Sequence, residues 1–309
     1  MHGYDLLVVG SANADLVIGV DRRPAAGETV LGSDLAVHPG GKGGNQSVAA
    51  ARLGARTALL ARVGDDAHGR LLLDAQRAAG VDTAGVLVGG APTGVALITV
   101  DPSGDNSIVV SPGANARLTP DDVRDAGALF AAARVVSLQL EIPPDTVAAA
   151  VRTSAEAGAR VVLNPSPPAP LPDGVPALCD PLVVNEHEAR FLLSDDPAAA
   201  GSSTPEAWAA ALLARGPRSV VVTLGAEGAL VATADGSSVR VPSPPVRAVD
   251  TTGAGDAFTG ALGWRLGAGD DLETAVRFAV RVGAAAVTRP GAQASFPAAE
   301  ELPEPWGEV

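Results

Sequence analysis

The chain has 309 residues, of which 47% are hydrophobic and 18% are charged, and its formal net charge at pH 7 is −13. This length allows about two domains or one large α/β unit, the composition argues against a disordered chain, and the negative charge argues against nucleic-acid binding. The single cysteine, Cys179, excludes an intrachain disulfide and a multi-cysteine metal site.

The sequence also indicates where the protein works. Its N-terminal segment has neither the basic stretch nor the cleavage site of a signal peptide. No apolar run reaches the ~18 residues that a membrane helix needs. We therefore expect a cytoplasmic protein without a membrane or nucleic-acid partner.

Continuous apolar runs alternate with alanine-rich segments along most of the chain. An apolar run that ends at turn residues is typical of a strand covered on both faces, as in a parallel sheet. Strands are expected at 5–9, 57–61, 134–138, 160–163, 181–184 and 219–223. Helices are expected at 44–53, 68–79, 120–131, 144–157, 204–214, 255–266 and 272–287, the last with Asp270 or Asp271 as its N-cap. The alternation predicts a three-layer α/β fold with a central, mostly parallel sheet.

Two regions break the alternation and contain pairs of short strand candidates with no helix between them. These lie at 16–20 and 31–38, and at 95–100 and 107–110. Such pairs predict antiparallel hairpins, which together can form a small sheet over the carboxyl edge of the main sheet, where α/β proteins bind ligands. Because isolated hairpins are marginally stable in water, this small sheet needs a partner surface, which a second subunit would provide.

Two polar segments near the N-terminus are candidates for ligand contacts. The first, GSANAD at 10–15, places Asn13 and Asp15 on one face of an extended chain, which suits neighbouring hydroxyl groups. The second, GGKGGNQ at 40–46, combines glycines that permit close backbone approach with Lys42, the only lysine, and Asn45. A polar turn would explain the first segment, and a chance position would explain the lysine of the second.

The strongest motif is DTTGAGDAFTG at 250–260, where small residues precede Asp256 at the expected start of a helix. Backbone N–H groups there can converge on an anion, and the helix N-terminus favours negative charge. A carboxylate beside a bound phosphate can act as a general base, whereas an ordinary capped helix would not require both Gly253 and Gly255. The chain has neither the P-loop nor the dinucleotide-binding glycine motif.

These three motifs, in this order, resemble those of the ribokinase family, also called the phosphofructokinase B family of sugar kinases. The resemblance extends from Gly10 to Ser295. It includes TGVALITVDPSGDNSIVVSPGAN from Thr93, QLE at 139–141, LNPS at 163–166 and RPGAQAS at 289–295. It implies a single kinase domain over residues 1–309 with a small β-sheet lid inserted from about 16–38 and 93–110. Members of the family pair through their lids, which implies a homodimer.

The resemblance implies ATP-dependent phosphorylation of D-ribose at its 5-hydroxyl. Asp256 matches the catalytic base of the family, and the backbone N–H groups of Gly253, Ala254, Gly255 and Asp256 match its anion hole. The residues that match its sugar contacts, together with the glycines around them and the base itself, are Asn13, Asp15, Gly41, Lys42, Gly43, Gly44, Asn45, Glu141 and Asp256.

The resemblance also implies ATP, Mg²⁺ and K⁺ as cofactors. Asn185 and Glu188 match an element that organises Mg²⁺ and phosphates. The matching nucleotide contacts are Thr223, Leu224, Gly225, Ala226, Glu227, Gly228, Gly255 and Val280, the last at a position where ribokinases often carry an asparagine. The K⁺ site would comprise Asp250, Thr252, Ala286, Arg289, Gly291 and Ser295, mostly through backbone carbonyls.

Two other functions stay open from the sequence. One is another sugar or nucleoside kinase of the same family, although a nucleoside needs an aromatic platform that the expected lid strands lack. The other is a sugar-binding regulator without catalysis, which would be expected to lack the base that Asp256 provides.

Overall fold

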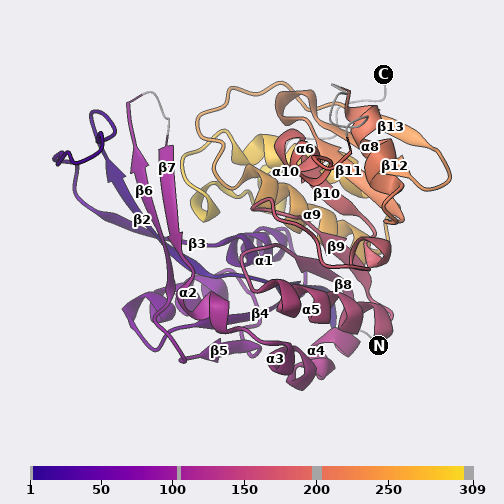
Figure 1. Ribbon diagram of the computed structural model, residues 1–309, viewed down its shortest axis with the longest axis horizontal. Coiled ribbons are helices and arrows are strands. Elements are labelled where there is room, and N and C mark those ends of the chain that lie inside the picture. Colours follow the sequence, from indigo (N-terminus) through magenta and orange to yellow (C-terminus); the bar gives the residue numbers. More distant parts are fainter. Residues whose placement is uncertain (1–2, 103–105, 197–203, 303–309) are drawn as a thin grey trace.

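A nine-stranded sheet forms the centre of the computed structural model, which describes residues 3–102, 106–196 and 204–302 (Figure 1). The strand order is β13-β12-β11-β10-β9-β8-β1-β4-β5. The strands from β5 to β11 run parallel, whereas β12 and β13 are antiparallel additions at one edge. Their bounds are β1 Tyr4–Val9, β4 Thr57–Val63, β5 Val86–Val88, β8 Ala133–Leu138, β9 Arg160–Leu163, β10 Leu182–Asn185, β11 Ser219–Thr223, β12 Ala229–Thr233 and β13 Ser238–Val241.

Helices cover both faces of this sheet because its central strands are apolar on both sides. Alternate residues of β1 belong to different hydrophobic clusters, Leu7 and Val9 to one and Leu6 and Val8 to the other. The first cluster contains side chains of α3 Pro120–Asp125, α4 Gly127–Ala132, α5 Pro144–Glu156, α6 Glu186–Leu192 and α8 Pro205–Leu213. The second contains side chains of α1 Lys42–Arg52, α9 Ala254–Ala268 and α10 Leu272–Ala286. This is the expected three-layer arrangement.

A second sheet of four strands, in the order β3-β2-β6-β7, projects from the main body (Figure 1). It consists of two antiparallel hairpins joined by parallel pairing of β2 and β6. The bounds are β2 Asn13–Gly19, β3 Ala36–Gly40, β6 Gly94–Val100 and β7 Asn106–Ser111. Helix α2, Ala67–Ala78, packs near its base. All of β7 is exposed, so one long edge of this sheet is open.

The structure differs from the sequence-based expectations in a few places. The helix expected at 120–131 is two short helices that meet at Ala126, the first closed by a capping box of Thr119 and Asp122. The strand expected at 31–38 is shorter, because only 36–40 pairs with β2 and residue 32 makes an isolated bridge. Asp271 rather than Asp270 caps α10, since Asp270 is paired with Arg265. Strands β5, β12 and β13 and helix α6 were not expected.

Helix α9 packs closely against its neighbours through glycines on one face. A Cβ atom at Gly260 would lie 2.4 Å from the carbonyl oxygen of Gln46 in α1, and one at Gly267 would lie 2.2 Å from the carbonyl oxygen of Asp5. Any larger side chain would have to displace backbone. The separation of α1 and α9 is therefore set at Gly260.

We predict that Gly260→Ala lowers the free energy of unfolding by about 1–3 kcal/mol, because the added methyl group forces α1 and α9 apart. Urea unfolding measures this effect. The matched control is Gly127→Ala in α4, where no heavy atom lies within 4 Å of the added Cβ. An equal effect of the two substitutions would contradict the close contact at Gly260.

Candidate active site

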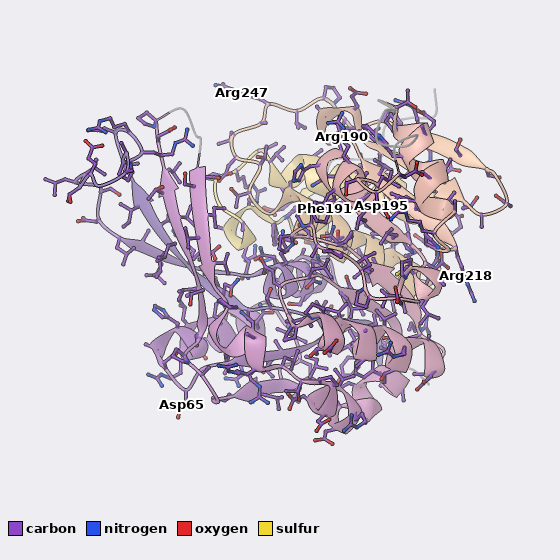
Figure 2. The ribbon with its side chains drawn as sticks, viewed as in Figure 1. Asp65, Arg190, Phe191, Asp195, Arg218 and Arg247 are labelled. Carbon is purple, nitrogen blue, oxygen red and sulfur yellow. The ribbon has the colours of Figure 1, made fainter. Side chains whose placement is uncertain are left out.

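The polar segments singled out in the sequence meet at the carboxyl edge of the main sheet. Residues 10–13 follow β1, residues 139–141 follow β8, and the first turns of α1 and α9 lie beside them. Parallel strands bring these ends together because all of them leave the sheet at the same edge. The charged side chains of Asp65, Arg218 and Arg247 project outward from the surface (Figure 2).

Asp256 lies in the first turn of α9 and is 7% exposed. Its carboxylate accepts hydrogen bonds from Asn45 Nδ2 at 2.9 Å and from Gln46 Nε2 at 3.2 Å. Burial raises the pKa of Asp256 above its usual range, although the positive charge of Lys42 and the hydrogen bond from Asn45 act in the opposite direction. A buried carboxylate with a raised pKa and fixed oxygens is suited to accept a proton.

Two further side-chain amides and a hydroxyl hold the two residues that contact Asp256. Gln46 Oε1 accepts from Ser137 Oγ at 2.8 Å and from Gln139 Nε2 at 2.5 Å. Asn45 Oδ1 accepts from Gln293 Nε2 at 3.1 Å. Gln46, Gln139 and Gln293 each lie within one of the motifs described above, but the sequence did not indicate a role for any of them.

The residues expected to contact a sugar form a second group beside Asp256. Glu141 accepts from Ser11 Oγ at 2.5 Å and from the backbone N–H of Lys42 at 3.1 Å, and Asn13 Nδ2 lies 3.5 Å away. Asn13 Oδ1 accepts from Asn115 Nδ2 at 2.7 Å, so its amide hydrogens face Glu141. Asn115 ends the stretch quoted from Thr93, but its role was missed because its contact with Asn13 depends on the pairing of β2 with β6.

The glycines around Lys42 allow this segment to lie directly against the turn after β1. Gly41 has a φ of 82°, and a Cβ atom on it would lie 2.6 Å from the backbone nitrogen of Asn13. A Cβ atom on Gly43 would likewise clash with the backbone of residues 10 and 11. Gly44 donates its N–H to the carbonyl oxygen of Ser11 at 2.8 Å. The glycine cluster is thus explained by close approach of two backbones.

Four carboxylates and one amine determine the charge balance of the site. Burial raises the pKa of Asp15 to about 7, with further contributions from the negative charges of Glu141 and Asp256. Lys42 stands among these acids. Burial alone would lower the pKa of this amine, but the carboxylates of Asp256, Glu141 and Glu188 raise it above its usual value. The lysine therefore stays charged.

A cavity of about 200 Å³ lies next to Asp256 and extends to the carboxyl ends of β9, β10 and β11. It is lined by Lys42, Asn164, Ser166, Val183, Val184, Asn185, Glu188, Thr223, Gly253, Gly255, Asp256 and Thr259. The N-terminus of α9 and a lysine on one small cavity make it a candidate anion site. Of the four predicted anion-hole N–H groups, that of Ala254 donates to the carbonyl oxygen of Thr251 at 3.2 Å.

The structure gives Asn185 and Glu188 a structural role in addition to their place on this cavity. They form a reciprocal capping box at the start of α6, in which each side chain accepts the backbone N–H of the other at 2.8 Å. Glu188 is 4% exposed, so its carboxylate is held at the cavity wall. The second carboxylate oxygen of Glu188 is of the kind that Mg²⁺ prefers, whereas Oδ1 of Asn185 already accepts the N–H of Glu188.

The expected nucleotide segment follows β11 as an exposed turn, and Thr223 at its start lines the cavity. The remaining residues of this turn are Leu224, Gly225, Ala226, Glu227 and Gly228. Val280 does not join them in the cavity. Its side chain belongs to the hydrophobic cluster under α10 and is 5% exposed.

Asp250 connects the segment before α9 with the turn after α10. Its carboxylate accepts from the N–H groups of Thr252 at 2.9 Å and Gly291 at 2.8 Å. Ala286 ends α10, and Ser295 Oγ donates to the carbonyl oxygen of Ala292. Arg289 turns its side chain to Glu301, which leaves only its backbone for a site here.

The oxygens of this turn, one carboxylate with hydroxyl and carbonyl groups, are of the kind that bind hard cations. In residues 3–102, 106–196 and 204–302 there is no group of three or more His, Cys, Asp or Glu side chains that could hold a metal ion. Within the same ranges no helix is long and apolar enough to cross a membrane.

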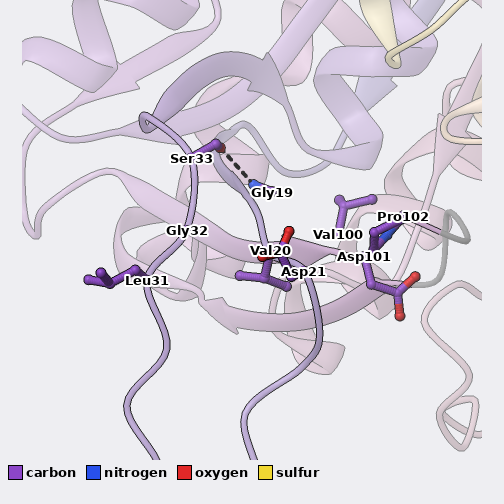
Figure 3. Close-up of a pocket in the computed structure, with 9 residues that line it drawn as sticks. All are labelled: Gly19, Val20, Asp21, Leu31, Gly32, Ser33, Val100, Asp101 and Pro102. Carbon is purple, nitrogen blue, oxygen red and sulfur yellow. Dashed lines mark hydrogen bonds between the residues drawn. The ribbon is translucent and has the colours of Figure 1, made fainter.

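A larger hollow of about 550 Å³ lies at the far end of the small sheet, between the ends of β2 and β6 and residues 31–33 (Figure 3). Ser33 Oγ accepts the N–H of Gly19 there at 2.9 Å, and Asp101 on its rim is paired with Arg23. It brings none of the predicted site residues together.

The model of the pfkB family of carbohydrate kinases matches residues 4–299. A ribokinase of Bacillus subtilis is 39% identical over 301 residues, which cover 97% of this chain and 98% of the relative. A deoxyribokinase of Salmonella typhi is 36% identical over 302 residues, with 97% and 98% covered. The structure of an Arabidopsis thaliana ribokinase complexed with ribose and ATP aligns with a TM-score of 0.86 at 32% identity, over 96% of each chain.

We predict that Asp15→Asn stabilises the ligand-free protein near pH 7.5 but has much less effect near pH 4. An unfolded aspartate ionises near pH 4, whereas Asp15 keeps its proton in the folded protein until about pH 7. The free energy of unfolding thus falls by roughly 1–3 kcal/mol as the pH rises through this window, and asparagine, which does not ionise, removes this loss. Urea unfolding at both pH values measures it.

Asp34→Asn, on the exposed segment before β3, controls for the loss of one negative charge from the same small sheet. A stabilisation by Asp15→Asn that is equal at the two pH values would contradict the raised pKa of Asp15.

Proposed function

The chain belongs to the pfkB family of carbohydrate kinases, and we propose that it transfers the γ-phosphoryl group of ATP to the 5-hydroxyl of D-ribose. The observation that carries this proposal is the position of Asp256, buried at the N-terminus of α9 beside a cavity that Lys42 also lines. Phosphoryl transfer demands mainly positioning and charge stabilisation, and this arrangement supplies both. We take residues 1–309 as one kinase domain with the small sheet as its lid.

In the proposed reaction Asp256 accepts the proton of the sugar hydroxyl as the sugar oxygen attacks the γ-phosphorus of ATP, and the bond from that phosphorus to the bridging oxygen breaks, so that ADP leaves with the electron pair. The amides of Asn45 and Gln46 aim its two oxygens, and the raised pKa lets it hold the proton afterwards. The charge on the transferred group is met by the backbone N–H groups of Gly253, Gly255 and Asp256 and by the ammonium of Lys42, since the N–H of Ala254 donates to Thr251.

The sugar is proposed to lie between the small sheet and the main body. Asn13 offers amide hydrogens, Asp15 and Glu141 offer carboxylates, and Gly41 to Asn45 allow close backbone approach. Adjacent hydroxyl groups, each both donor and acceptor, suit such a set. The small-sheet strands β2, β6 and β7 contain no aromatic residue, and β3 contains no Phe, Tyr or Trp, which favours a sugar over a nucleoside.

ATP is proposed to occupy the cavity with its phosphates and the turn at 223–228 with its nucleoside. Asn185 and Glu188 would hold Mg²⁺, which supplies charge neutralisation of the phosphates when bound. Asp250 and Thr252, with the backbone of Ala286, Arg289 and Gly291 and with Ser295, would hold K⁺ and so keep the turn before α9 in place. We place the reaction in the cytoplasm, a reducing compartment that suits a chain with one cysteine.

A sugar panel tests this function directly. With ATP and Mg²⁺, in K⁺ and in Na⁺, we expect turnover of D-ribose above 2-deoxyribose and other sugars, and higher rates in K⁺. Asp256→Asn should lower kcat by ~10²–10⁴-fold with the fold intact, because the general base is lost. Ribose turnover at the level of unrelated sugars would refute the substrate, and an unchanged kcat of Asp256→Asn would refute the base.

We also propose a homodimer through the small sheet, over residues 16–38 and 93–110 within the described part. Its register places Val17, Ile98 and Ile108 opposite one another, on the face that carries Asn13 and Asp15. Leu97 and Val109 lie on the other face, and Ile108 and Val109 are 53% and 66% exposed. Open edges and apolar faces of this kind call for a partner.

Ile108→Asp should therefore weaken dimerisation and raise the KM for ribose together, because one face serves both. Val109→Asp, next to it in β7 but on the opposite face, is the matched control and should alter the KM far less. Analytical ultracentrifugation measures dimerisation of both variants, and steady-state kinetics measures their KM for ribose. A monomeric native protein at micromolar concentration would be incompatible with this proposal.

A further inference from the structure

Two consecutive hydrogen bonds between side chains connect the turn after α10 to Asp256. Gln293, in the short 3₁₀ helix Gln293–Ser295, is 5% exposed and donates through Nε2 to Asn45 Oδ1 at 3.1 Å. Asn45 is 6% exposed and in turn donates through Nδ2 to Asp256 Oδ2 at 2.9 Å. All three groups are shielded from water, so none can readily exchange its partner for solvent.

The donor-to-acceptor direction of these two hydrogen bonds fixes the orientation of the Asn45 amide. An asparagine side chain has one accepting oxygen and one donating nitrogen, and rotation by 180° exchanges them. The N–H of Gln293 at Oδ1 requires that the nitrogen of Asn45 faces Asp256. In the opposite orientation an amide oxygen would face a carboxylate, which is unfavourable for its ionised form.

Gln293 can impose this orientation because its own position is fixed. The guanidinium of Arg52 donates to the carbonyl oxygens of both Gln293 and Phe296. Asp250 holds the same turn two residues earlier through the N–H of Gly291. These contacts fix the backbone of the turn, from which the side-chain amide of Gln293 reaches Asn45.

We propose that Gln293 is a positioning residue for the general base, which it serves by holding the Asn45 amide in the orientation that donates to Asp256. The inference rests on the proposed function for the role of Asp256 as base. Gln293 does not line the cavity, and its side-chain hydrogen bond to the residues proposed for the sugar goes to Asn45, through which it acts. The other oxygen of Asp256 has an equivalent support, because Ser137 and Gln139 orient Gln46.

The hydrogen bond from Asn45 lowers the pKa of Asp256, so its loss should raise that pKa. The charged groups that act on Asp256 are Lys42 on α1 and Glu141 after β8. The negative charge of Asp256 in turn raises the pKa of Asp15 on β2. None of these contacts Gln293. A substitution of Gln293 therefore changes one hydrogen bond at Asp256 and leaves its neighbouring charges in place.

The first test is Gln293→Met, which keeps the size of the side chain and removes the donor. We expect the acidic limb of the pH profile of kcat to move up by about half to one pH unit, with the KM for ribose nearly unchanged. Gln293→Glu offers Asn45 an acceptor and should turn its amide away from Asp256, which moves the limb further in the same direction. An acidic limb at the wild-type pH in both variants would overturn the proposal.

The matched control is Gln76→Met. Gln76 is 2% exposed and also bonds to the first turn of α1, where it donates to the carbonyl oxygen of Gly44 and accepts from Ser47 Oγ. It has no connection to Asp256, so its substitution should lower stability without moving the pH profile. An equal shift in Gln76→Met would mean that loosening of α1, and not Gln293, is responsible.

A double-mutant cycle separates positioning from general stability. In an Asn45→Ala background, Gln293→Met should have no further effect on the pH profile, because the residue through which it acts is absent. A persistent effect would overturn the proposal. If the wild type does not phosphorylate ribose, the proposed function fails, but a carboxyl ¹³C NMR titration of Asp256 in the ligand-free protein still decides the inference. A higher midpoint in Gln293→Met supports it, and an unchanged midpoint refutes it.

Discussion

The contact between α1 and α9 is the constraint on which the candidate site depends. With no side chain at Gly260, the two helices approach until the carbonyl oxygen of Gln46 lies against the backbone of α9. At this separation the amides of Asn45 and Gln46 reach both oxygens of Asp256. A wider gap would leave a buried carboxylate without hydrogen bonds, which costs far more than the contact itself gains.

The same edge of the sheet concentrates charges that oppose folding. Asp15, Glu141 and Asp256 lie close enough to affect one another, and burial raises the pKa of Asp15 and Asp256. Lys42 is the amine that offsets them, which gives a physical reason for the only lysine of the chain to stand here. A site that binds hydroxyl and phosphate groups thus carries its polar groups before the ligands arrive, at a cost in stability.

The neighbourhood of Asp256 is also held from outside the motif that contains it. Gln46 is oriented by residues that follow β8, and Asn45 by a residue after α10. These supports come from segments more than 90 positions apart in the sequence from the residues they hold. The base is positioned by the packed body as a whole and not by the glycine-rich turn alone.

The sequence by itself determined the alternating α/β fold, the two hairpins and the three polar motifs, because each depends on residues close together in the chain. Asp5 to Val9 reads as a buried strand, and Gly253 to Asp256 reads as a helix start, from local pattern alone. Only the tertiary structure decided that Asn115 orients Asn13, that Gln293 orients Asn45, and that Val280 lies in the core. An amide has the same local signature in a turn, a core or a site, so its role is defined by the partner that folding brings to it.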